Sequence, residues 1–320
     1  PPQEIDKRLN ESTSFVYLKR QIPPEVAERV SELHIPGLFQ NREYRRYYPG
    51  GEVMAHVLGF TGADDVGQEG IELAFQSTLA GKSGSRRVIK DRMGQIVEDM
   101  ESIREAQNGR DLALALDAKL QNLAFSQLKL AVESNKAKAG AIVVLDAKTG
   151  EVLALANLPT YNPNNRSRLS GAQLRNRVIT DTFEPGSTLK PFTVALAIEQ
   201  GKITPESMIA TASGSLSIGK ATVHDAHTFG DMSVAQVIQR SSNVGAARIA
   251  LSLPAEALWG MFDQVGFGSV PRLGFPGEVG GRLRAYKTWR PIEQATMAYG
   301  HGISVSLLQL ARAYTIFARD

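Results

Sequence analysis

The order of apolar and polar positions divides the chain into two parts near residue 109. In the first part, short apolar stretches are interrupted by turns rich in Pro and Gly, such as Pro49-Gly50-Gly51, which is typical of an irregular module. In the second part, apolar residues recur at strand or helix spacing over longer runs. A chain of 320 residues usually forms more than one domain, so we expect one domain over residues 1–109 and another over 110–320.

The second part alternates between strand and helix patterns. A short apolar run at 112–116 predicts a strand, and Asp117 is placed to cap a helix from Ala118 to Glu133. Two apolar runs joined by the turn residues 146–150 predict a β-hairpin over 141–145 and 152–156. After Gly186 the pattern predicts a helix to about Glu199. Four further helical runs follow: 234–240, 246–251, 293–298 and 307–317.

Composition excludes several classes of protein. The hydrophobic share of 42% and the charged share of 22% are those of a globular protein. The sequence contains no run of about 18 apolar residues, so no membrane span is predicted. The net charge of +3 comes without a nucleic-acid-binding motif, so no nucleic acid is expected as a partner. Cysteine is absent, which excludes disulfides, thiolate catalysis and cysteine metal sites.

The strongest candidate for chemistry is Ser187, with Lys190 three residues later. Pro185 and Gly186 interrupt the preceding pattern and a helix follows, so Ser187 falls at a helix N-terminus, where backbone N–H groups favour negative charge. The spacing puts both side chains on one helix face. Serine needs a base within hydrogen-bond reach, and a lysine whose pKa is lowered by burial can be that base. The alternative interpretation is an N-capping serine beside an exposed lysine.

A second candidate signal is Ser241-Ser242-Asn243, about fifty residues later. It lies between two predicted helical runs, and its alternative interpretation is a polar junction with Asn as a cap. S-x-x-K at a Pro-Gly helix start followed by S-x-N is much rarer than either motif alone. Together, the two motifs indicate serine acyl-transfer chemistry.

Both motifs mark the penicillin-recognising serine acyltransferases, and the resemblance extends over most of the chain. Residues 155–164, 183–191 and 240–245 resemble class B penicillin-binding proteins, and residues 298–302 also fit. Arg46-Tyr47-Tyr48-Pro49 and residues 67–72 resemble the non-catalytic pedestal of that class. Within the class, the chain is most similar to the division-specific members.

The resemblance implies an α+β fold. It predicts a penicillin-binding, β-lactamase-like transpeptidase domain over 110–320, with an antiparallel sheet carrying helices on both faces and an all-helical lobe. An irregular α/β pedestal is expected over 1–109. The third family motif, K-[ST]-G, is absent between Asn243 and Asp320. We therefore expect the C-terminal part of the catalytic domain to be missing and the active site of this chain to be incomplete.

The resemblance also implies a role for each motif residue. Ser187 would attack the penultimate D-Ala carbonyl of a stem peptide, and Lys190 would take its proton. Ser241 would relay protons. Asn243 would bind the substrate amide and help to hold Lys190. The backbone N–H of Ser187 would form half of the oxyanion hole.

The implied function is a peptidoglycan D,D-transpeptidase for septal cell-wall synthesis. Its partners would be stem peptides, β-lactams bound covalently at Ser187, and divisome membrane proteins that include a glycosyltransferase. The catalytic domain would be periplasmic, on a protein held in the inner membrane by a single-pass anchor that is absent from this chain. No cofactor or metal is implied.

Several alternatives stay open or are set aside. A serine β-lactamase of class A would need an E-x-x-x-N after S-x-N, and residues 244–320 contain none. A non-catalytic β-lactam sensor or a division scaffold is a further alternative. Lys82-Ser83-Gly84 and Lys148-Thr149-Gly150 match K-[ST]-G in the wrong places, and His224 and His227 are interpreted as polar loop residues rather than a metal pair.

Overall fold

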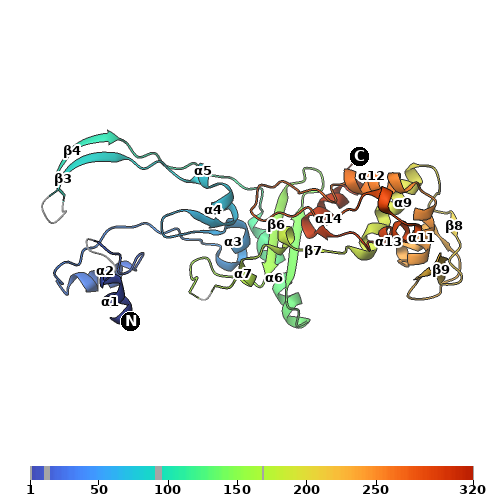
Figure 1. Ribbon diagram of the computed structural model, residues 1–320, viewed down its shortest axis with the longest axis horizontal. Helices are drawn as coiled ribbons and strands as arrows, with labels where there is room; N and C mark the ends of the chain where they lie inside the picture. Colours follow the sequence, from blue (N-terminus) through green and yellow to red (C-terminus); the bar gives the residue numbers. More distant parts are fainter. Residues whose placement is uncertain (1, 11–14, 91–95, 168, 320) are drawn as a thin grey trace. The chain divides into compact units, whose positions relative to one another are not determined.

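The computed structural model describes residues 2–10, 15–90, 96–167 and 169–319. The chain forms two compact units. Figure 1 shows their helices and strands, coloured along the sequence. Unit 1 comprises Pro1–Gly51, Val57–Leu112 and Asn162–Arg166. Unit 2 comprises Glu52–His56, Ala113–Tyr161 and Ser167–Asp320. Within the described residues, no helix is both long and apolar enough to cross a bilayer.

Unit 1 consists of short elements, as its many turn residues predict. Its strands pair as two antiparallel hairpins, β1–β2 and β3–β4. The elements are α1 (Pro2–Asn10), α2 (Pro24–Ser31), β1 (Phe60–Thr61), β2 (Gly67–Glu69), α4 (Gly70–Ala74), α5 (Gln76–Leu79), β3 (Ser85–Lys90) and β4 (Ile96–Arg104). Helix α3 (Gly51–Leu58) contributes residues to both units.

A buried tyrosine joins three distant stretches of unit 1. Tyr48 is 6% exposed, and its hydroxyl accepts from the Thr61 N–H at 2.9 Å and donates to Glu72 at 3.3 Å. The Asn164 side chain bonds both the N–H and the carbonyl of Tyr48, at 3.0 and 2.9 Å. The two stretches that resemble pedestal motifs therefore meet around one side chain.

Unit 2 contains the predicted capped helix and hairpin. Asp117 accepts from the backbone N–H groups of Lys119 and Leu120, both at 2.8 Å, at the start of α6 (Ala118–Ser134). Strands β5 (Gly140–Leu145) and β6 (Val152–Leu158) pair antiparallel, with residues 146–150 in the turn. The predicted helix and hairpin are confirmed.

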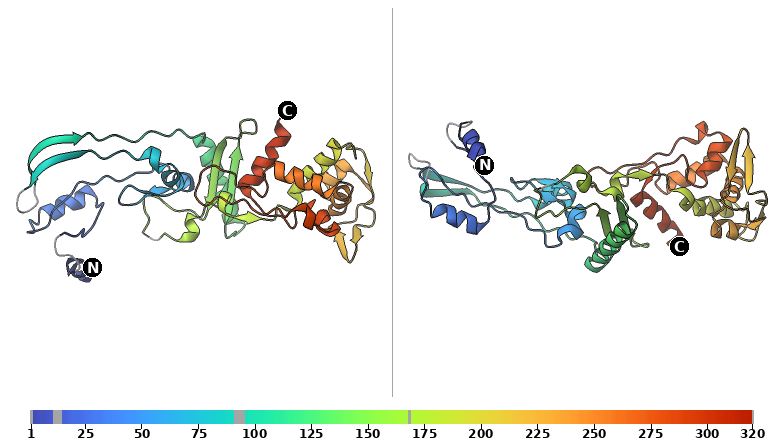
Figure 2. Two further views of the ribbon diagram at one scale, coloured as in Figure 1. Left: turned by 45° about the horizontal axis from the view of Figure 1, so that its top comes forward. Right: turned by 90° about the horizontal axis from the view of Figure 1, so that it is seen from below.

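Helices lie on both faces of β5–β6. Ile142 and Ala156 pack with apolar residues of α6. Asn157 points to the opposite face because successive strand residues alternate. There its side-chain oxygen accepts from the Val178 N–H of α8 (Arg177–Thr180) at 3.1 Å. Helix α14 (Leu307–Tyr314, red) also contacts β5, and Figure 2 shows it beside the green strands.

The strand predicted over 112–116 is wrong. This stretch belongs to no strand or helix, and the Asp117 N–H that follows it bonds β6 at the Leu153 carbonyl (2.9 Å). Leu114 is 37% exposed, so the apolar run is not buried as a strand in a sheet would be. The run has the composition of a strand but no partner for a ladder within the described residues.

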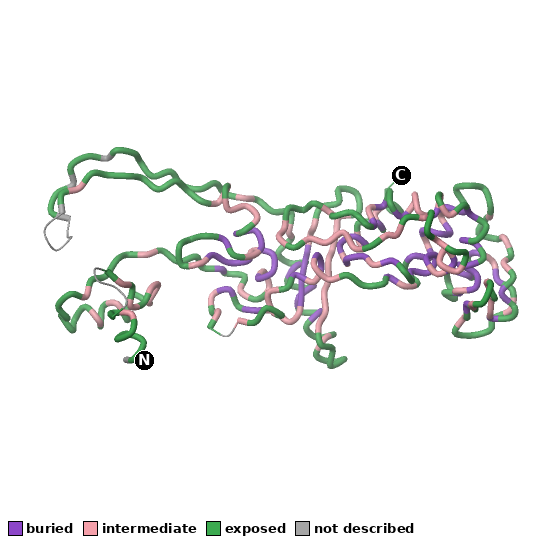
Figure 3. The backbone as a smooth tube through the Cα atoms, viewed as in Figure 1, coloured by how far each residue is buried: buried purple, intermediate pink, exposed green. Residues whose placement is uncertain are grey.

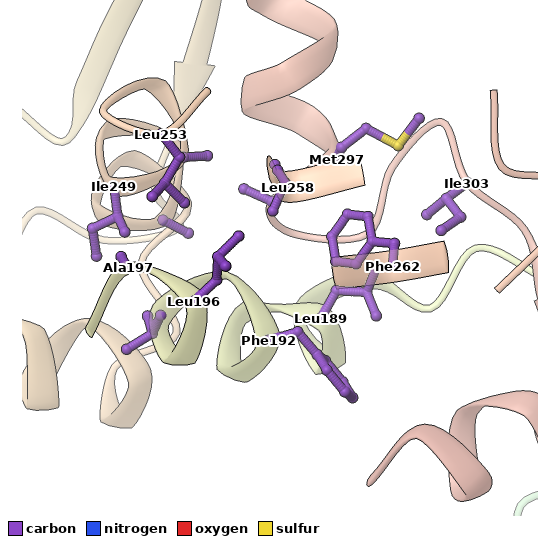
Figure 4. Close-up of a cluster of buried hydrophobic side chains, with 14 of the residues drawn as sticks. Leu189, Phe192, Leu196, Ala197, Ile249, Leu253, Leu258, Phe262, Met297 and Ile303 are labelled. Atoms are coloured by element: carbon purple, nitrogen blue, oxygen red, sulfur yellow. The ribbon is translucent and has the colours of Figure 1, made fainter. Parts of the chain in front are cut away.

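The remaining helices of unit 2 form a lobe around α9 (Lys190–Glu199). Buried residues (purple in Figure 3) gather here, and Figure 4 shows Leu189, Phe192 and Phe262 within this core, all 0% exposed. The surrounding elements are α10 (Val234–Gln239), α11 (Asn243–Leu251), α12 (Ala255–Gln264) and α13 (Pro291–Met297).

The four later helical runs are confirmed with shifted ends. Helix α11 begins at Asn243, three residues before the predicted start, and α14 ends at Tyr314, where a 3-10 turn (Thr315–Ala318) follows. Helix α12 and the hairpin of β9 (Ser215–Ile218) and β10 (Ala221–His224) were not predicted.

Gln309 of α14 joins loops of unit 2 through a buried amide. Its side chain is 2% exposed and donates to the carbonyls of Gly266, Ser269 and Gly280 at 3.1, 2.9 and 2.8 Å. Its oxygen accepts from the Ser306 N–H at 2.8 Å. Several backbone groups of the lobe therefore depend on one side chain.

We expect Gln309→Leu to destabilise the chain by about 2–4 kcal/mol, because buried carbonyls would lose their partner without a large change in volume. The measurement is urea unfolding followed by fluorescence of Trp259 and Trp289, the chain's two tryptophans. Gln239→Leu, at an exposed position, is the matched control with an expected change below about 0.5 kcal/mol. Equal effects of the two variants would contradict this expectation.

Candidate active site

The candidate nucleophile lies in a tight turn that local sequence signals produce. Strand β7 (Thr182–Phe183) ends before Glu184-Pro185, and Gly186 takes a left-handed φ of +60°. A 3-10 turn, Gly186–Leu189, leads into α9. Leu189 is fully buried while Ser187 is exposed, so the turn is anchored by one side chain and presents the other. Ser187 thus lies at the helix start, as predicted.

Lys190 is buried directly beneath this serine. Its side chain is 1% exposed, and its Nζ donates to the Ser187 Oγ at 3.0 Å. Two further acceptors come from Ser241, its Oγ at 3.0 Å and its carbonyl at 2.5 Å. An ammonium has three donors, and these three contacts match them. The structure therefore brings Ser187, Lys190 and Ser241 together.

Burial lowers the pKa of Lys190 to about 8, while the nearby Asp225 carboxylate acts in the opposite direction. The cause is loss of hydration, which disfavours the charged amine more than the neutral one. A neutral amine at this position has a lone pair within hydrogen-bond reach of the Ser187 hydroxyl. The geometry therefore allows Lys190 to accept a proton from Ser187.

Ser241 reaches Lys190 because the chain turns sharply after α10. It has a left-handed φ of +56°, a conformation that costs a non-glycine residue about 1 kcal/mol or more. The turn is held by the Ser242 N–H, which bonds the Val237 carbonyl at 3.0 Å. Backbone strain of this kind is concentrated at functional sites. Here the left-handed conformation directs the carbonyl and the hydroxyl of Ser241 toward the Lys190 amine.

Asp225, which follows His224 in the chain, organises the S-x-N motif. Its carboxylate accepts from the Ser242 Oγ at 2.7 Å and from the N–H groups of Asn243 and Val244 at 2.5 and 2.9 Å. Ser242 in turn caps α11 by accepting from the Gly245 N–H at 2.8 Å. An Asp in a loop seventeen residues before Ser242 gave no spacing signal for this role.

Asn243 has a different partner from the one expected. Its side-chain amide donates to the His224 carbonyl at 3.1 Å, and the contacts to Lys190 come from Ser187 and Ser241 instead. Asn243 is half-buried at the first position of α11, beside the Lys190–Ser241 pair. A role in binding the substrate amide stays a prediction.

Two other candidate motifs have local roles: one forms a turn, and the side chains of the other form no metal pair. Lys148-Thr149-Gly150 forms the β5–β6 turn, where Asp146 accepts from the Lys148 and Thr149 N–H groups at 2.8 and 2.7 Å. The rings of His227 and Phe229 meet edge to face, with centroids 5.8 Å apart. Among the described residues, no group of three or more His, Cys, Asp or Glu side chains could hold a metal ion.

Comparison with known proteins decides the family. Residues 140–320 match the model of the penicillin binding protein transpeptidase domain, and residues 1–114 match that of the penicillin-binding protein dimerisation domain. The chain belongs to the penicillin-binding protein transpeptidase family. The resemblance to class B penicillin-binding proteins and the α+β transpeptidase fold are thereby confirmed.

Individual relatives agree with this assignment. The chain is 44% identical over 317 residues to a probable peptidoglycan D,D-transpeptidase PenA of Neisseria gonorrhoeae, covering 98% of the chain and 54% of the relative. It is 42% identical over 316 residues to the peptidoglycan D,D-transpeptidase FtsI of Escherichia coli, covering 98% and 53%. The chain therefore spans about half the length of these curated relatives.

Solved structures support the same fold. A transpeptidase domain of Burkholderia pseudomallei penicillin-binding protein 3 is 48% identical, with a TM-score of 0.59 over 64% of this chain and 57% of that chain. A structure from Burkholderia ambifaria, described as a peptidoglycan glycosyltransferase, is 50% identical, with the same TM-score over 64% and 61%.

We expect Asp225→Ala to destabilise unit 2 by about 2 kcal/mol, because a helix cap and charged hydrogen bonds are lost together. Asp225→Asn keeps an acceptor oxygen and should lose less. Urea unfolding measures both, with the exposed Asp263→Ala as control. An Ala variant as stable as the wild type would contradict the capping role.

Proposed function

We propose that this chain carries the acylation centre of a peptidoglycan D,D-transpeptidase. The observation that supports it most directly is the Lys190 Nζ, 3.0 Å from the hydroxyls of both Ser187 and Ser241. The similarity to relatives named peptidoglycan D,D-transpeptidases supports the substrate class. Stem peptides that end in D-Ala-D-Ala are the proposed substrates.

In the proposed first step, the Ser187 oxygen attacks the carbonyl of the penultimate D-Ala. Lys190 accepts the hydroxyl proton, and the terminal D-Ala leaves as its amine is protonated through Ser241. The Ser187 N–H, at the start of the 3-10 turn, would donate to the developing oxyanion. The acyl group would then pass to an amine of a neighbouring stem peptide.

Burial of Lys190 lowers the free-energy cost of its neutral, basic form at neutral pH. Neutralising a lysine of ordinary pKa at pH 7 costs roughly 5 kcal/mol, at 1.36 kcal/mol for each pKa unit. With a pKa of about 8, the cost falls to roughly 1–2 kcal/mol. This reduction in free-energy cost is comparable to the lowering of the activation barrier that a general base usually provides.

The proposed setting is septal cell-wall synthesis on the periplasmic side of the inner membrane. The similarity to the relative named FtsI supports the division role. Its proposed partners are divisome membrane proteins, including a glycosyltransferase, and β-lactams are proposed as covalent ligands of Ser187. The roles of Asn243 and of the relay through Ser241 belong to the same proposal.

Intact-mass measurement of the full-length protein with a penicillin tests the nucleophile. We expect one adduct per molecule in the wild type and none in Ser187→Ala, because the acyl-enzyme analogue forms only at this oxygen. A wild-type protein without an adduct would refute the proposed function. Fast turnover of a chromogenic cephalosporin, instead of a stable adduct, would favour a β-lactamase.

The pH dependence of acylation tests the base. The second-order acylation rate constant should rise with pH and level off above about 8, because the reactive form of Lys190 is the deprotonated amine. Lys190→Ala should lower the rate constant by a hundredfold or more. A flat profile between pH 6 and 9, or near-normal labelling of the variant, would remove Lys190 from this role.

A further inference from the structure

A second chain segment, Tyr299–Gly302, lies against the turn that presents Ser187. The Gly186 N–H donates to the Gly300 carbonyl at 3.3 Å. The approach is so close that a Cβ on Gly300 would lie 2.2 Å from the Gly186 carbonyl oxygen, and Gly300 has a φ of +80°. Glycine is therefore required at position 300, and the nucleophile turn rests directly on this segment.

The carboxylate of Glu184 joins the two segments through both of its oxygens. One oxygen accepts from the Gly302 N–H at 2.8 Å, and the other is 3.0 Å from the His301 Nδ1. These two contacts lower the pKa of Glu184, the Gly302 N–H being the larger cause. Glu184 is about half exposed, so these contacts contribute little to global stability.

Hydrogen bonds before and after Ser187 hold the flanking parts of the turn. Strands β7 and β12 (Val305–Ser306) pair antiparallel, with Phe183 opposite Val305. The Tyr314 hydroxyl donates to the Thr188 carbonyl at 2.6 Å, on the far side of Ser187. Between these two anchors, Glu184 supplies the side-chain link from the turn to residues 301–302.

We propose that Glu184 is a positioning residue for acylation, which holds the Ser187 turn on the His301–Gly302 segment. The inference rests on the proposed function of Ser187. It adds a further residue to that function. Among the described residues, the Glu184 carboxylate bonds His301 and the Gly302 N–H and none of the reacting groups, so it acts through the backbone of the turn. A shift of about 1 Å in a nucleophile can lower a rate by about a hundredfold, so a modest loosening of the turn is sufficient.

Glu184 holds the turn by the geometry of its two contacts rather than by its charge. Two conservative variants distinguish these two effects. Glu184→Gln keeps an oxygen for the Gly302 N–H and an amide group for His301, with the side-chain length unchanged. Glu184→Asp keeps the charge but is one methylene shorter, so it cannot keep both contacts in place. A positioning role therefore ranks Gln above Asp, and an electrostatic role ranks Asp above Gln.

The experiment uses the full-length protein and a chromogenic β-lactam in stopped-flow acylation, which separates the non-covalent Kd from the first-order acylation step. We expect Glu184→Asp and Glu184→Ala to slow that step at least tenfold with Kd within about threefold. Glu184→Gln should stay within about threefold of the wild type. Glu199→Ala removes an exposed carboxylate at the other end of α9 and should change neither constant.

The outcomes are distinguishable. A wild type without a Ser187 adduct refutes the proposed function, and this inference falls with it. Normal acylation by the wild type and by Glu184→Asp overturns the inference alone, as does a Gln variant slower than the Asp variant. If Glu184→Ala fails to fold, the Gln and Asp variants still decide, provided that their thermal midpoints equal that of the wild type.

Discussion

The amine of Lys190 is enclosed between Ser187 and Ser241, and the arrangement of the candidate site in unit 2 depends on keeping it there. An ammonium that is 1% exposed is stable only when its hydrogen bonds are satisfied, and here two serines from segments about fifty residues apart satisfy them. The same enclosure lowers the pKa of the amine. One packing constraint therefore both holds the three side chains together and lowers the pKa of the amine.

Two groups of contacts hold Ser187 and Ser241 in place beside Lys190. On one side, Asp225 binds Ser242 and the first N–H groups of α11, which keeps the left-handed turn at Ser241 aimed at the amine. On the other side, Glu184 and Gly300 fasten the Ser187 turn to a segment more than a hundred residues later. The hydrophobic cluster around Phe192 (Figure 4) includes Leu189, which follows the Ser187 turn, and Val237, which precedes the Ser241 turn.

Where the signals are local, the sequence predicted the structure well. Asp117 caps α6 through N–H groups two and three residues away, and the β5–β6 hairpin follows from two apolar runs around a five-residue turn. Ser187 and Lys190 meet because a spacing of three residues in a helical turn places them on one face. The strand predicted over 112–116 failed because a strand also needs a partner, and composition does not supply one.

The sequence by itself determined the family motifs, the α+β class and the identity of the candidate nucleophile and base, since these depend on residue type and short spacing. Only the tertiary structure decided that Ser241 rather than Asn243 contacts Lys190, that Asp225 caps the motif, and that Glu184 binds His301. These contacts join residues 17 to 117 positions apart, and no local periodicity encodes them. They exist because the packed lobe brings separate turns within hydrogen-bond distance.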